Sequence, residues 1–231
     1  MKYLITTRSD ERVKHLADIS HPLIKEYAAK VSADFLILDH DPESDSGDGR
    51  PHYRIMKHYD LHEEYDRILH IDTDMIMLPN FPNLFRAIPY DTIASVYEDK
   101  GTRKQARLAT LINAQNKFGF LNWTEGYINT GLFITSKCHR DVYKKINNDF
   151  WTGFGSDDVH IGYLIKKHRF KILELPFQFN HMTMFSEPWN NNANRFDSKI
   201  IHYAGRGVFD ENIENKYEQM KADYEHIYGK K

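Results

Sequence analysis

Two carboxylates separated by one residue, Asp72 and Asp74, follow the strand-like run RILHI at residues 67–71. In an extended chain, side chains two residues apart point to the same side, so both carboxylates can reach one cation. Carboxylate oxygens suit Mg²⁺ and Mn²⁺, and such ions usually complete their coordination with phosphate oxygens of a substrate. The pattern therefore predicts a metal and diphosphate site, although aspartate is also common in ordinary turns after strands.

The elements that must position this pair alternate between strand and helix. Apolar runs predict strands at residues 3–6, 35–38, 67–71, 92–96, 127–135, 170–175 and 200–203. Helical patterns cover residues 9–17, 23–31, 53–65, 102–115, 141–150 and 157–167, with a break expected at His21 and Pro22. This alternation predicts one α/β domain with a mainly parallel central sheet flanked by helices. Ligands of such sheets bind at the carboxyl ends of the strands, where Asp72 and Asp74 lie.

Four further segments have distinct patterns. The acidic stretch at residues 39–50 predicts a mobile surface loop, because Ser44 and Arg50 stand where a calcium loop needs glycine and glutamate. The long connection at residues 101–126 suits either a lid over a site or plain packing. Residues 176–198 have no clear period and suggest a binding loop, in which Phe185 and Trp189 would suit a carbohydrate by stacking, or would simply pack. A C-terminal amphipathic helix at residues 210–228 has one apolar stripe, for core packing or, second, a homodimer contact.

The bulk composition limits the class of partner. The chain has 231 residues, with 31 basic and 33 acidic side chains and a net charge of −2. A dedicated surface for nucleic acid or anionic membranes is therefore not expected. The one cysteine, Cys138, cannot form an internal disulfide, and no apolar run is long enough to cross a membrane. We expect a soluble protein in the cytoplasm.

The segment YDRILHIDTDMIMLPN at residues 65–80 resembles the nucleotide-sugar motif of GT-A glycosyltransferases, especially family 8, which includes glycogenin and bacterial galactosyltransferases. Further motifs follow in the family's order: Asn-x-Gly at Asn129 and Gly131, the Asp-Gln position at Asp157 and Asp158, and His-x-x-Gly at 202–205. Residues 175–180 also resemble the family's Leu-Pro and Asn segment. The resemblance spans residues 53–207 and implies that residues 1–231 form a single GT-A (Rossmann-like) domain.

The resemblance also implies the ligands. It makes His202 the third metal ligand beside Asp72 and Asp74, around Mn²⁺ or Mg²⁺, with a nucleotide-sugar donor, expected to be a UDP-sugar, and a carbohydrate acceptor. A basic residue of the helix at 53–65 should reach the donor, and the residues that the resemblance places at the donor are Thr6, Thr7, Arg54 or Lys57, Thr73, Asn129, Gly131 and Gly205. The family usually has a lysine and then Pro-Trp shortly after this glycine; here we infer that Arg206 neutralises the diphosphate.

The residue pair Asp157 and Asp158 decides the expected mechanism. Family 8 enzymes retain anomeric configuration and usually carry glutamine at the position of Asp158, whereas DDVHIG at residues 157–162 resembles the Glu-Asp-Val motif of inverting β-1,3-galactosyltransferases. We favour inversion with Asp158 as general base, and a helix-capping role for Asp157 is the structural alternative. A retaining transferase, a nucleotidyltransferase and a non-catalytic nucleotide-sugar-binding module stay open, although a nucleotidyltransferase should show a glycine-rich loop after the first strand.

Overall fold

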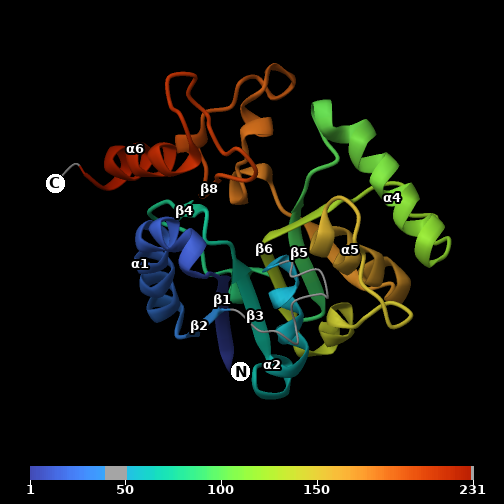
Figure 1. The fold of residues 1–231 in the computed structure, drawn as a ribbon. Helices are drawn as coiled ribbons and strands as arrows, with labels where there is room; N and C mark the ends of the chain where they lie inside the picture. The colour runs from blue at the N-terminus through green and yellow to red at the C-terminus, as the bar shows by residue number, and fades with distance from the viewer. Residues whose placement is uncertain (40–50, 230–231) are drawn as a thin grey trace.

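Six strands form the central sheet in the order β2-β1-β3-β6-β5-β7 (Figure 1), in a computed structural model that describes residues 1–39 and 51–229. Nearly all of the predicted acidic loop at residues 39–50 lies outside the described residues. The strands are β1 (Tyr3–Arg8), β2 (Asp34–Leu38), β3 (Arg67–Ile71), β5 (Thr92–Tyr97), β6 (Ile128–Ser136) and β7 (Lys171–Glu174).

The predicted mainly parallel sheet is confirmed. β1 pairs in parallel with β2 and β3, and β5 pairs in parallel with β7. β6 runs antiparallel between β3 and β5 and is buried along its whole length. Because β6 is reversed, its first residues lie at the same edge of the sheet as the carboxyl ends of β1 and β3.

A second, two-stranded sheet joins β4 (Met75–Met77) to β8 (Ile200–His202) in antiparallel register, with Met75 opposite His202. The sequence pattern did not reveal β4, because it has only three residues and follows directly after Asp74. The backbone N–H of Tyr203 donates to the carbonyl of Asp74 at 2.9 Å. This pairing brings the His202 region beside the Asp72–Asp74 turn although about 130 residues separate them in the sequence.

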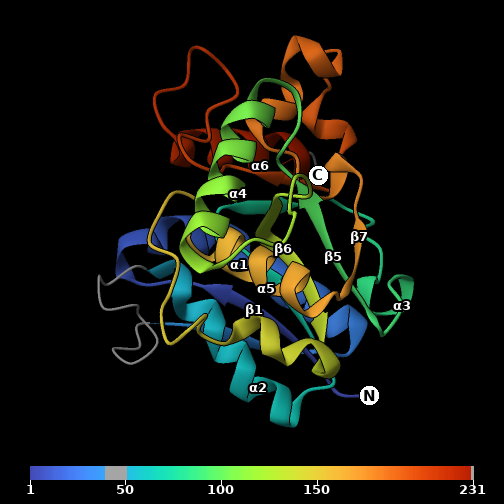
Figure 2. The ribbon, with the colours of Figure 1, turned by 90° about the vertical axis from the view of Figure 1, so that its right-hand side faces the viewer.

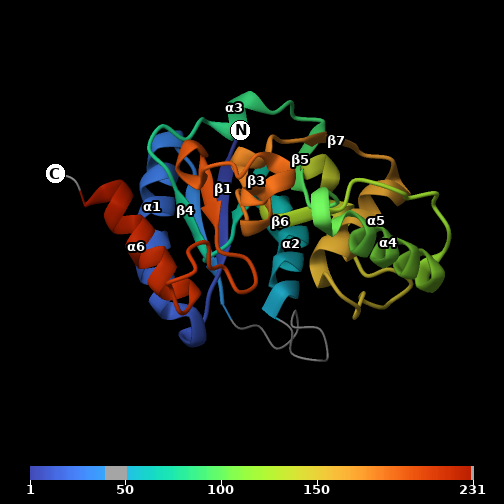
Figure 3. The same ribbon diagram turned by 90° about the horizontal axis from the view of Figure 1, so that it is seen from above.

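Helices cover both faces of the central sheet (Figures 2 and 3). On one side lie α1 (Lys14–Val31) and, packed against it, α6 (Lys216–Tyr228). On the other lie α2 (His58–Glu64), α5 (Ser156–His168) and α4 (Lys104–Phe118), with α4 outermost against α5. The short helices are α3 (Leu84–Ala87) and the 3₁₀ turns η1 (Glu11–Val13), η2 (Pro51–Lys57), η3 (Gly101–Arg103), η4 (Lys137–Tyr143), η5 (Phe177–Phe179), η6 (Thr183–Ser186), η7 (Pro188–Asn190) and η8 (Arg195–Asp197).

Two helix predictions, a break at Pro22 and a helix at residues 141–150, are wrong. The expected break at Pro22 does not occur: α1 continues through it, because Pro22 lies on the exposed side of the helix, where the carbonyl that loses its N–H partner can face solvent. The predicted helix at residues 141–150 is absent. Asn147 and Asn148 adopt left-handed backbone angles (φ 51° and 63°) in a tight turn closed by a bridge between Ile146 and Asp149.

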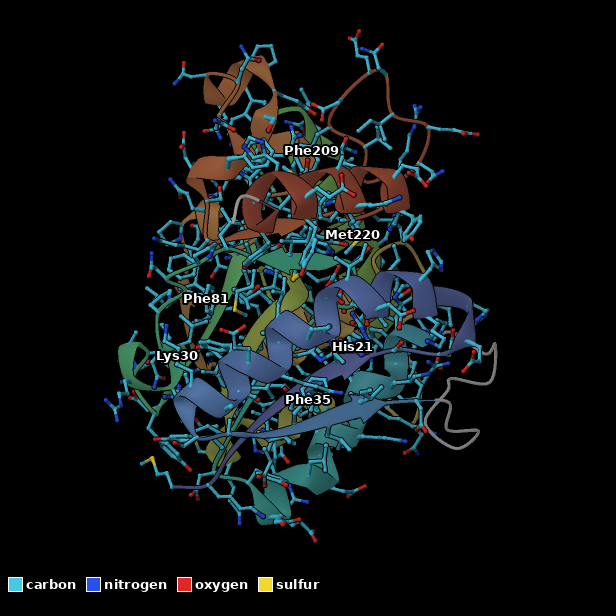
Figure 4. All side chains as sticks on the ribbon, turned by 90° about the vertical axis from the view of Figure 1, so that its left-hand side faces the viewer. His21, Lys30, Phe35, Phe81, Phe209 and Met220 are labelled. Carbon is cyan, nitrogen blue, oxygen red and sulfur yellow. The ribbon has the colours of Figure 1, made fainter. Side chains whose placement is uncertain are left out.

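The C-terminal helix begins at Lys216, six residues later than predicted, because the Asn215 side chain caps it by accepting from the N–H groups of Tyr217 and Glu218. Its apolar stripe packs into the fold: Met220 is fully buried in a cluster with Leu16 of α1 (Figure 4). None of the helices within residues 1–39 and 51–229 has the length and apolar character that crossing a bilayer requires.

Candidate active site

A cleft of about 670 Å³ opens at the sheet edge where β1 and β3 end and β6 begins. Its walls come from segments far apart in the sequence. Among the lining residues are Arg8, Asp72, Asp74, Glu98, Arg103, Arg107, Asn129, Thr130, Phe154, Asp157, Asp158, Met182, Met184, His202, Gly205 and Arg206. The cleft therefore collects the carboxylates that the sequence motifs singled out, together with His202 and Arg206.

Asp72, Asp74 and His202 converge at one point of this cleft. One ligand atom from each lies within 4.8 Å of the other two. His202 Nε2 is 3.2 Å from Asp74 Oδ1 and 4.0 Å from Asp72 Oδ2. Two carboxylate oxygens and one imidazole nitrogen form a donor set that fits Mn²⁺, and also accepts Mg²⁺.

Each of the two carboxylates divides its oxygens between His202 and a cation. Asp72 Oδ1 accepts from Arg8 at 2.6 Å, and Asp74 Oδ2 accepts from Lys216 Nζ at 2.8 Å. The remaining oxygens, Asp72 Oδ2 and Asp74 Oδ1, face His202. Asp72 Oδ2, Asp74 Oδ1 and His202 Nε2 are thus oriented toward one common position, where a metal ion could bind.

The charges around the two aspartates keep them ionised. Burial alone would raise the pKa of Asp72, but the Arg8 guanidinium and the hydrogen bond with His70 outweigh it and hold that pKa well below its usual value. Burial opposes ionisation of Asp74 in the same way, yet the facing His202 and Lys216 lower its pKa overall. Both side chains are therefore carboxylates at neutral pH, as metal ligands must be.

Arg8, at the end of β1, links the metal-site carboxylates to the opposite wall. Its side chain is only 10% exposed, and it donates to Asp72, to Asp157 Oδ2 at 2.6 Å and to the His52 carbonyl at 2.7 Å. Burial would lower the pKa of Arg8, but the two carboxylates raise it. Arg8 is thus a buried, permanently charged crosslink between Asp72 and the start of α5.

Asp157 and Asp158, in the first turn of α5, have different environments. Asp157 does not cap the helix: Gly155 occupies the N-cap position, and Asp157 Oδ2 instead accepts from Arg8 and from Thr130 Oγ1. Asp158 is partly exposed in the cleft, and its Oδ1 accepts from the Thr130 N–H at 2.7 Å. Asp158 Oδ2 has no hydrogen-bond partner in the part of the chain that the structure describes.

The Thr130 hydroxyl lies between these two carboxylates, 2.7 Å from Asp157 Oδ2 and 2.8 Å from Asp158 Oδ1. The Thr130 hydroxyl has one proton and can donate to only one of these carboxylates at a time. The pKa of Asp158 is raised well above its usual value by burial and by the charges of Asp157 and Glu98, which outweigh the Thr130 hydrogen bonds. Asp158 is therefore the proton-binding carboxyl group of the cleft.

A series of buried polar side chains connects Asp72 to residues of β1, β3 and α2. His70 Nε2 is 3.1 Å from Asp72 Oδ1, and His70 Nδ1 is 2.9 Å from Thr6 Oγ1. Thr6 also contacts His58 Nε2 at 2.8 Å, and His58 Nδ1 contacts the Tyr143 hydroxyl at 3.1 Å. Burial is the main cause of the lowered pKa of both His58 and His70. This series buttresses Asp72 from the side opposite the cleft.

The remaining predicted donor residues are distributed over several places. Thr6 and Thr7 are fully buried and do not line the cleft; Thr7 Oγ1 contacts Thr73 Oγ1 at 3.0 Å. A second cavity of about 380 Å³ lies beside the cleft, shares Arg8, Asp72 and Asp74 with it, and includes Thr73, Arg54, Asp10 and Lys216. Lys57 lines neither cavity. Their roles in donor binding stay predictions.

The glycines and the aromatic loop are also placed. Gly131 touches the site closely: a Cβ there would lie 2.7 Å from His202 Cε1. Gly205 has φ +63° and open space around it, and exposed Arg206 lines the cleft beside it. Phe185 is buried and Trp189 is 39% exposed; both line a third cavity, of about 350 Å³, rather than the cleft.

Sequence reasoning missed several charged residues of the site, namely Arg8, Lys216, Glu98, Arg103 and Arg107. Arg8 had one available signal, since it follows a predicted strand whose end should lie beside that of the next parallel strand. Lys216 and Glu98 reach the site only through the tertiary fold, and no local pattern marks them.

The chain matches no protein-family model and no curated protein by sequence. Solved structures do match it. A glycosyltransferase involved in the glycosylation of the major capsid of PBCV-1 superposes with a TM-score of 0.60 at 13% identity, covering 96% of this chain and 100% of that one. The galactosyltransferase LgtC, in complex with donor and acceptor sugar analogs, gives 0.55 at 12% identity over 97% and 96% of the two chains. Mouse xyloside xylosyltransferase 1 gives 0.54 at 10% identity over 90% and 99%.

The chain has the GT-A glycosyltransferase fold. This confirms the predicted fold and the resemblance on which it was based. At identities of 10–13%, the likeness establishes the GT-A architecture, and the activity has to be argued from the site itself.

Proposed function

We propose that this protein is a metal-dependent glycosyltransferase that moves a sugar from a nucleotide diphosphate sugar, expected to be a UDP-sugar, to a carbohydrate hydroxyl. The observation that carries the proposal is the convergence of Asp72 Oδ2, Asp74 Oδ1 and His202 Nε2 in the main cleft of a GT-A fold. Two ionised aspartates and one imidazole leave coordination positions for diphosphate oxygens.

The two adjoining cavities suit the two parts of a donor. Because both include Asp72 and Asp74, a diphosphate at these residues would have its nucleoside in the smaller cavity and its sugar in the larger one. Lys216 in the smaller cavity and Arg206 in the larger one are the cations available to neutralise the phosphates. The acceptor would enter the part of the cleft lined by Phe154, Met182 and Met184.

Breaking the bond between the anomeric carbon and the diphosphate leaves negative charge on the departing phosphate. A bound Mn²⁺ or Mg²⁺ would supply Lewis-acid stabilisation of that charge. Asp72, Asp74 and His202 would hold the ion, and Arg8 fixes the orientation of Asp72 through two hydrogen bonds from one guanidinium. Lys216 lies close enough to exchange its contact with Asp74 for one with a phosphate oxygen.

Asp158 is the proposed general base, with inversion of configuration. Asp158 Oδ2 is available in the cleft. The raised pKa makes the ionised Asp158 a stronger base, which favours removal of the proton from the acceptor hydroxyl as the new glycosidic bond forms. Asp157 is less suited to this task because Arg8 and Thr130 occupy its Oδ2. A retaining reaction is the alternative outcome. We also propose a reducing, cytoplasmic setting, in keeping with the exposed free thiol of Cys138.

A two-step experiment tests the proposal. A thermal-shift screen of nucleotide sugars with Mn²⁺ identifies the donor, because a ligand bound only by the native state raises the melting temperature. The selected donor is then incubated with Mn²⁺ or with EDTA, with and without oligosaccharide acceptors, and the anomeric configuration of any product is read by NMR. Metal-dependent turnover supports the proposal, and a β-linked product from an α-linked donor supports inversion. Binding without any turnover or donor hydrolysis would instead indicate a binding module.

A further inference from the structure

A row of polar side chains leads away from His202 on the side opposite the metal position. His202 Nδ1 is 2.7 Å from Asn180 Oδ1, and Asn180 Nδ2 donates to Asn129 Oδ1 at 2.7 Å. Asn129 Nδ2 in turn donates to Glu98 Oε1 at 2.6 Å. Glu98 Oε2 accepts from Arg107 Nε at 2.8 Å. Each of the four links is within ordinary hydrogen-bond distance.

The direction of every bond in this row is determined by its far end. The carboxylate of Glu98, paired with Arg107, can only accept, so it must receive the amide N–H of Asn129. The Asn129 oxygen then faces the other way, where the backbone N–H of Gly131 also donates to it at 3.0 Å. Asn180 must therefore donate to Asn129 and present its own oxygen to His202.

An amide oxygen facing His202 Nδ1 requires a proton on that nitrogen. In the neutral imidazole the lone pair then resides on Nε2, the atom that faces Asp72 and Asp74. The opposite tautomer would place two acceptors against each other at Nδ1. Without a metal ion a bare Nε2 would face the Asp74 oxygen at 3.2 Å, so this row determines the proton on Nδ1, and a bound cation is what a bare Nε2 would suit. Metal binding needs a bare ring nitrogen, so the row selects the tautomer that can bind.

The packing makes this arrangement rigid. Asn180 is completely buried, and Glu98, Asn129 and His202 are each at most 7% exposed. A Cβ at Gly131 would come within 2.8 Å of Asn129 Oδ1 as well as within 2.7 Å of the His202 ring. Only glycine therefore fits beside this ring and this amide, and both are enclosed by protein atoms.

We propose that Glu98, Asn129 and Asn180 are positioning residues that hold His202 as the Nδ1–H tautomer and so prepare Nε2 to bind a divalent ion. The row of polar side chains begins at Arg107 of α4. The guanidinium of Arg107 packs against the rings of Tyr127 and Phe154, 4.9 and 4.7 Å from their centroids. This connects the helix beside the cleft to a metal ligand. The role of the row as preparation for metal binding rests on the proposed function, whereas the tautomer itself does not.

The test uses protein labelled with ¹⁵N-histidine and kept free of metal. Long-range ¹H–¹⁵N spectra report which ring nitrogen carries the proton, and the His202 signals are assigned by their disappearance in His202→Gln. We expect Nδ1 to be protonated in the metal-free wild-type protein, and Nε2 to be bare once diamagnetic Mg²⁺ is added. In Asn180→Leu, which keeps the side-chain volume but removes both amide groups, the preference should be lost. Mn²⁺ affinity, measured by EPR titration, should fall by roughly 10- to 100-fold.

Asn190→Leu is the matched control, since the Asn190 amide donates to the Phe185 carbonyl in the same loop region but lies outside the row. It should change neither the tautomer nor the Mn²⁺ affinity. A wild-type His202 whose Nδ1 carries no proton overturns the inference even if Asn180→Leu fails to fold. So does a folded Asn180→Leu with wild-type tautomer and affinity. A wild-type protein that has the expected tautomer but binds no Mn²⁺ would contradict the proposed function and leave the positioning of the ring intact.

Discussion

Lys216 Nζ lies 2.8 Å from Asp74 Oδ2, the oxygen that does not face His202, although 142 residues separate the two in the sequence. The C-terminal helix thus delivers a cation directly to the candidate metal site. The lysine neutralises part of the charge that Asp72 and Asp74 accumulate there. Lys216 also lines the smaller cavity, which is the proposed binding position of the donor's nucleoside.

Replacing this lysine should therefore separate metal binding from nucleotide binding. In Lys216→Met, Mn²⁺ alone should bind at least as tightly as to the wild type, because a repelling charge has been removed. UDP with Mn²⁺ should bind more weakly by about 1.5–3 kcal/mol, the usual value of a hydrogen bond to a charged group. Calorimetric titration of each ligand measures both effects. Unchanged UDP affinity would remove Lys216 from the donor site.

Arg8 should matter to stability as well as to the site. Arg8→Met leaves the buried carboxylates of Asp72 and Asp157 without their shared cation, which should lower the free energy of unfolding by roughly 3–5 kcal/mol. Arg12→Met is the control: this side chain is 69% exposed and pairs with Asp10, so the loss should stay below about 1 kcal/mol. Urea unfolding at pH 7 gives both values. Equal losses would show that Arg8 is not the crosslink described above.

Two glycines of the site should respond differently to alanine. Gly131→Ala puts a methyl group into the space of the His202 ring, so it should weaken Mn²⁺ binding and cost roughly 1–3 kcal/mol of stability. Gly205→Ala meets nothing within 4 Å and should cost only about 1 kcal/mol, for the left-handed backbone. Thermal unfolding and EPR titration compare the two variants. Wild-type Mn²⁺ affinity in Gly131→Ala would contradict the close packing of His202.

The pH dependence of transfer should report Asp158. Because its pKa is raised, kcat/KM should rise with pH along an acidic limb that lies above the usual range of a carboxyl group. Asp158→Asn should remove this limb and reduce transfer by roughly 10²- to 10⁴-fold while sparing nucleotide binding. Full transfer by Asp158→Asn would exclude Asp158 as the base and favour the retaining alternative.

Seven buried histidines of the described residues have a lowered pKa and should make the fold acid-sensitive. Burial lowers the pKa of His21, His62, His160 and His181 from 6.5 to about 4. Between these values the unfolded chain binds more protons than the folded one, so stability falls as the pH falls, by roughly 1.4 kcal/mol per histidine and pH unit. The raised pKa of Asp158 acts in the opposite sense, but it is one group against these seven histidines.

Urea unfolding at pH 7 and pH 5 measures this difference. His62→Gln should flatten the dependence, whereas His168→Gln, at an exposed helix end, should leave it unchanged. Equal stability of the wild-type protein at the two pH values would show that these histidines do not carry the predicted shifts.

The parts of the site that could be predicted are those with a local signature. Asp72 and Asp74 follow an apolar strand, and strand alternation places them at the ligand-binding edge of the sheet. His202 is one of 13 histidines, so only its place in the motif resemblance singled it out. Glu98 has no such signature, since its importance comes from Arg107 and Asn129, which reach it from α4 and β6.

The errors in the fold have equally local causes. Pro22 suggested a break because the sequence does not show that the residue lies on the exposed side of α1. Helical spacing at residues 141–150 outweighed the turn signal of Asn147 and Asn148. β4 escaped detection because three residues are too few for a period. The first two lie away from the site, whereas β4 pairs with β8 and so brings His202 to Asp72 and Asp74.

The central claim is that His202 Nε2, with Asp72 and Asp74, holds a divalent ion, and electron spin-echo envelope modulation of protein-bound Mn²⁺ tests it most directly. The account predicts modulation from a single imidazole nitrogen, lost in His202→Gln but kept in His226→Gln on the exposed side of α6. Bound Mn²⁺ with no nitrogen modulation, or modulation that persists in His202→Gln, would contradict it.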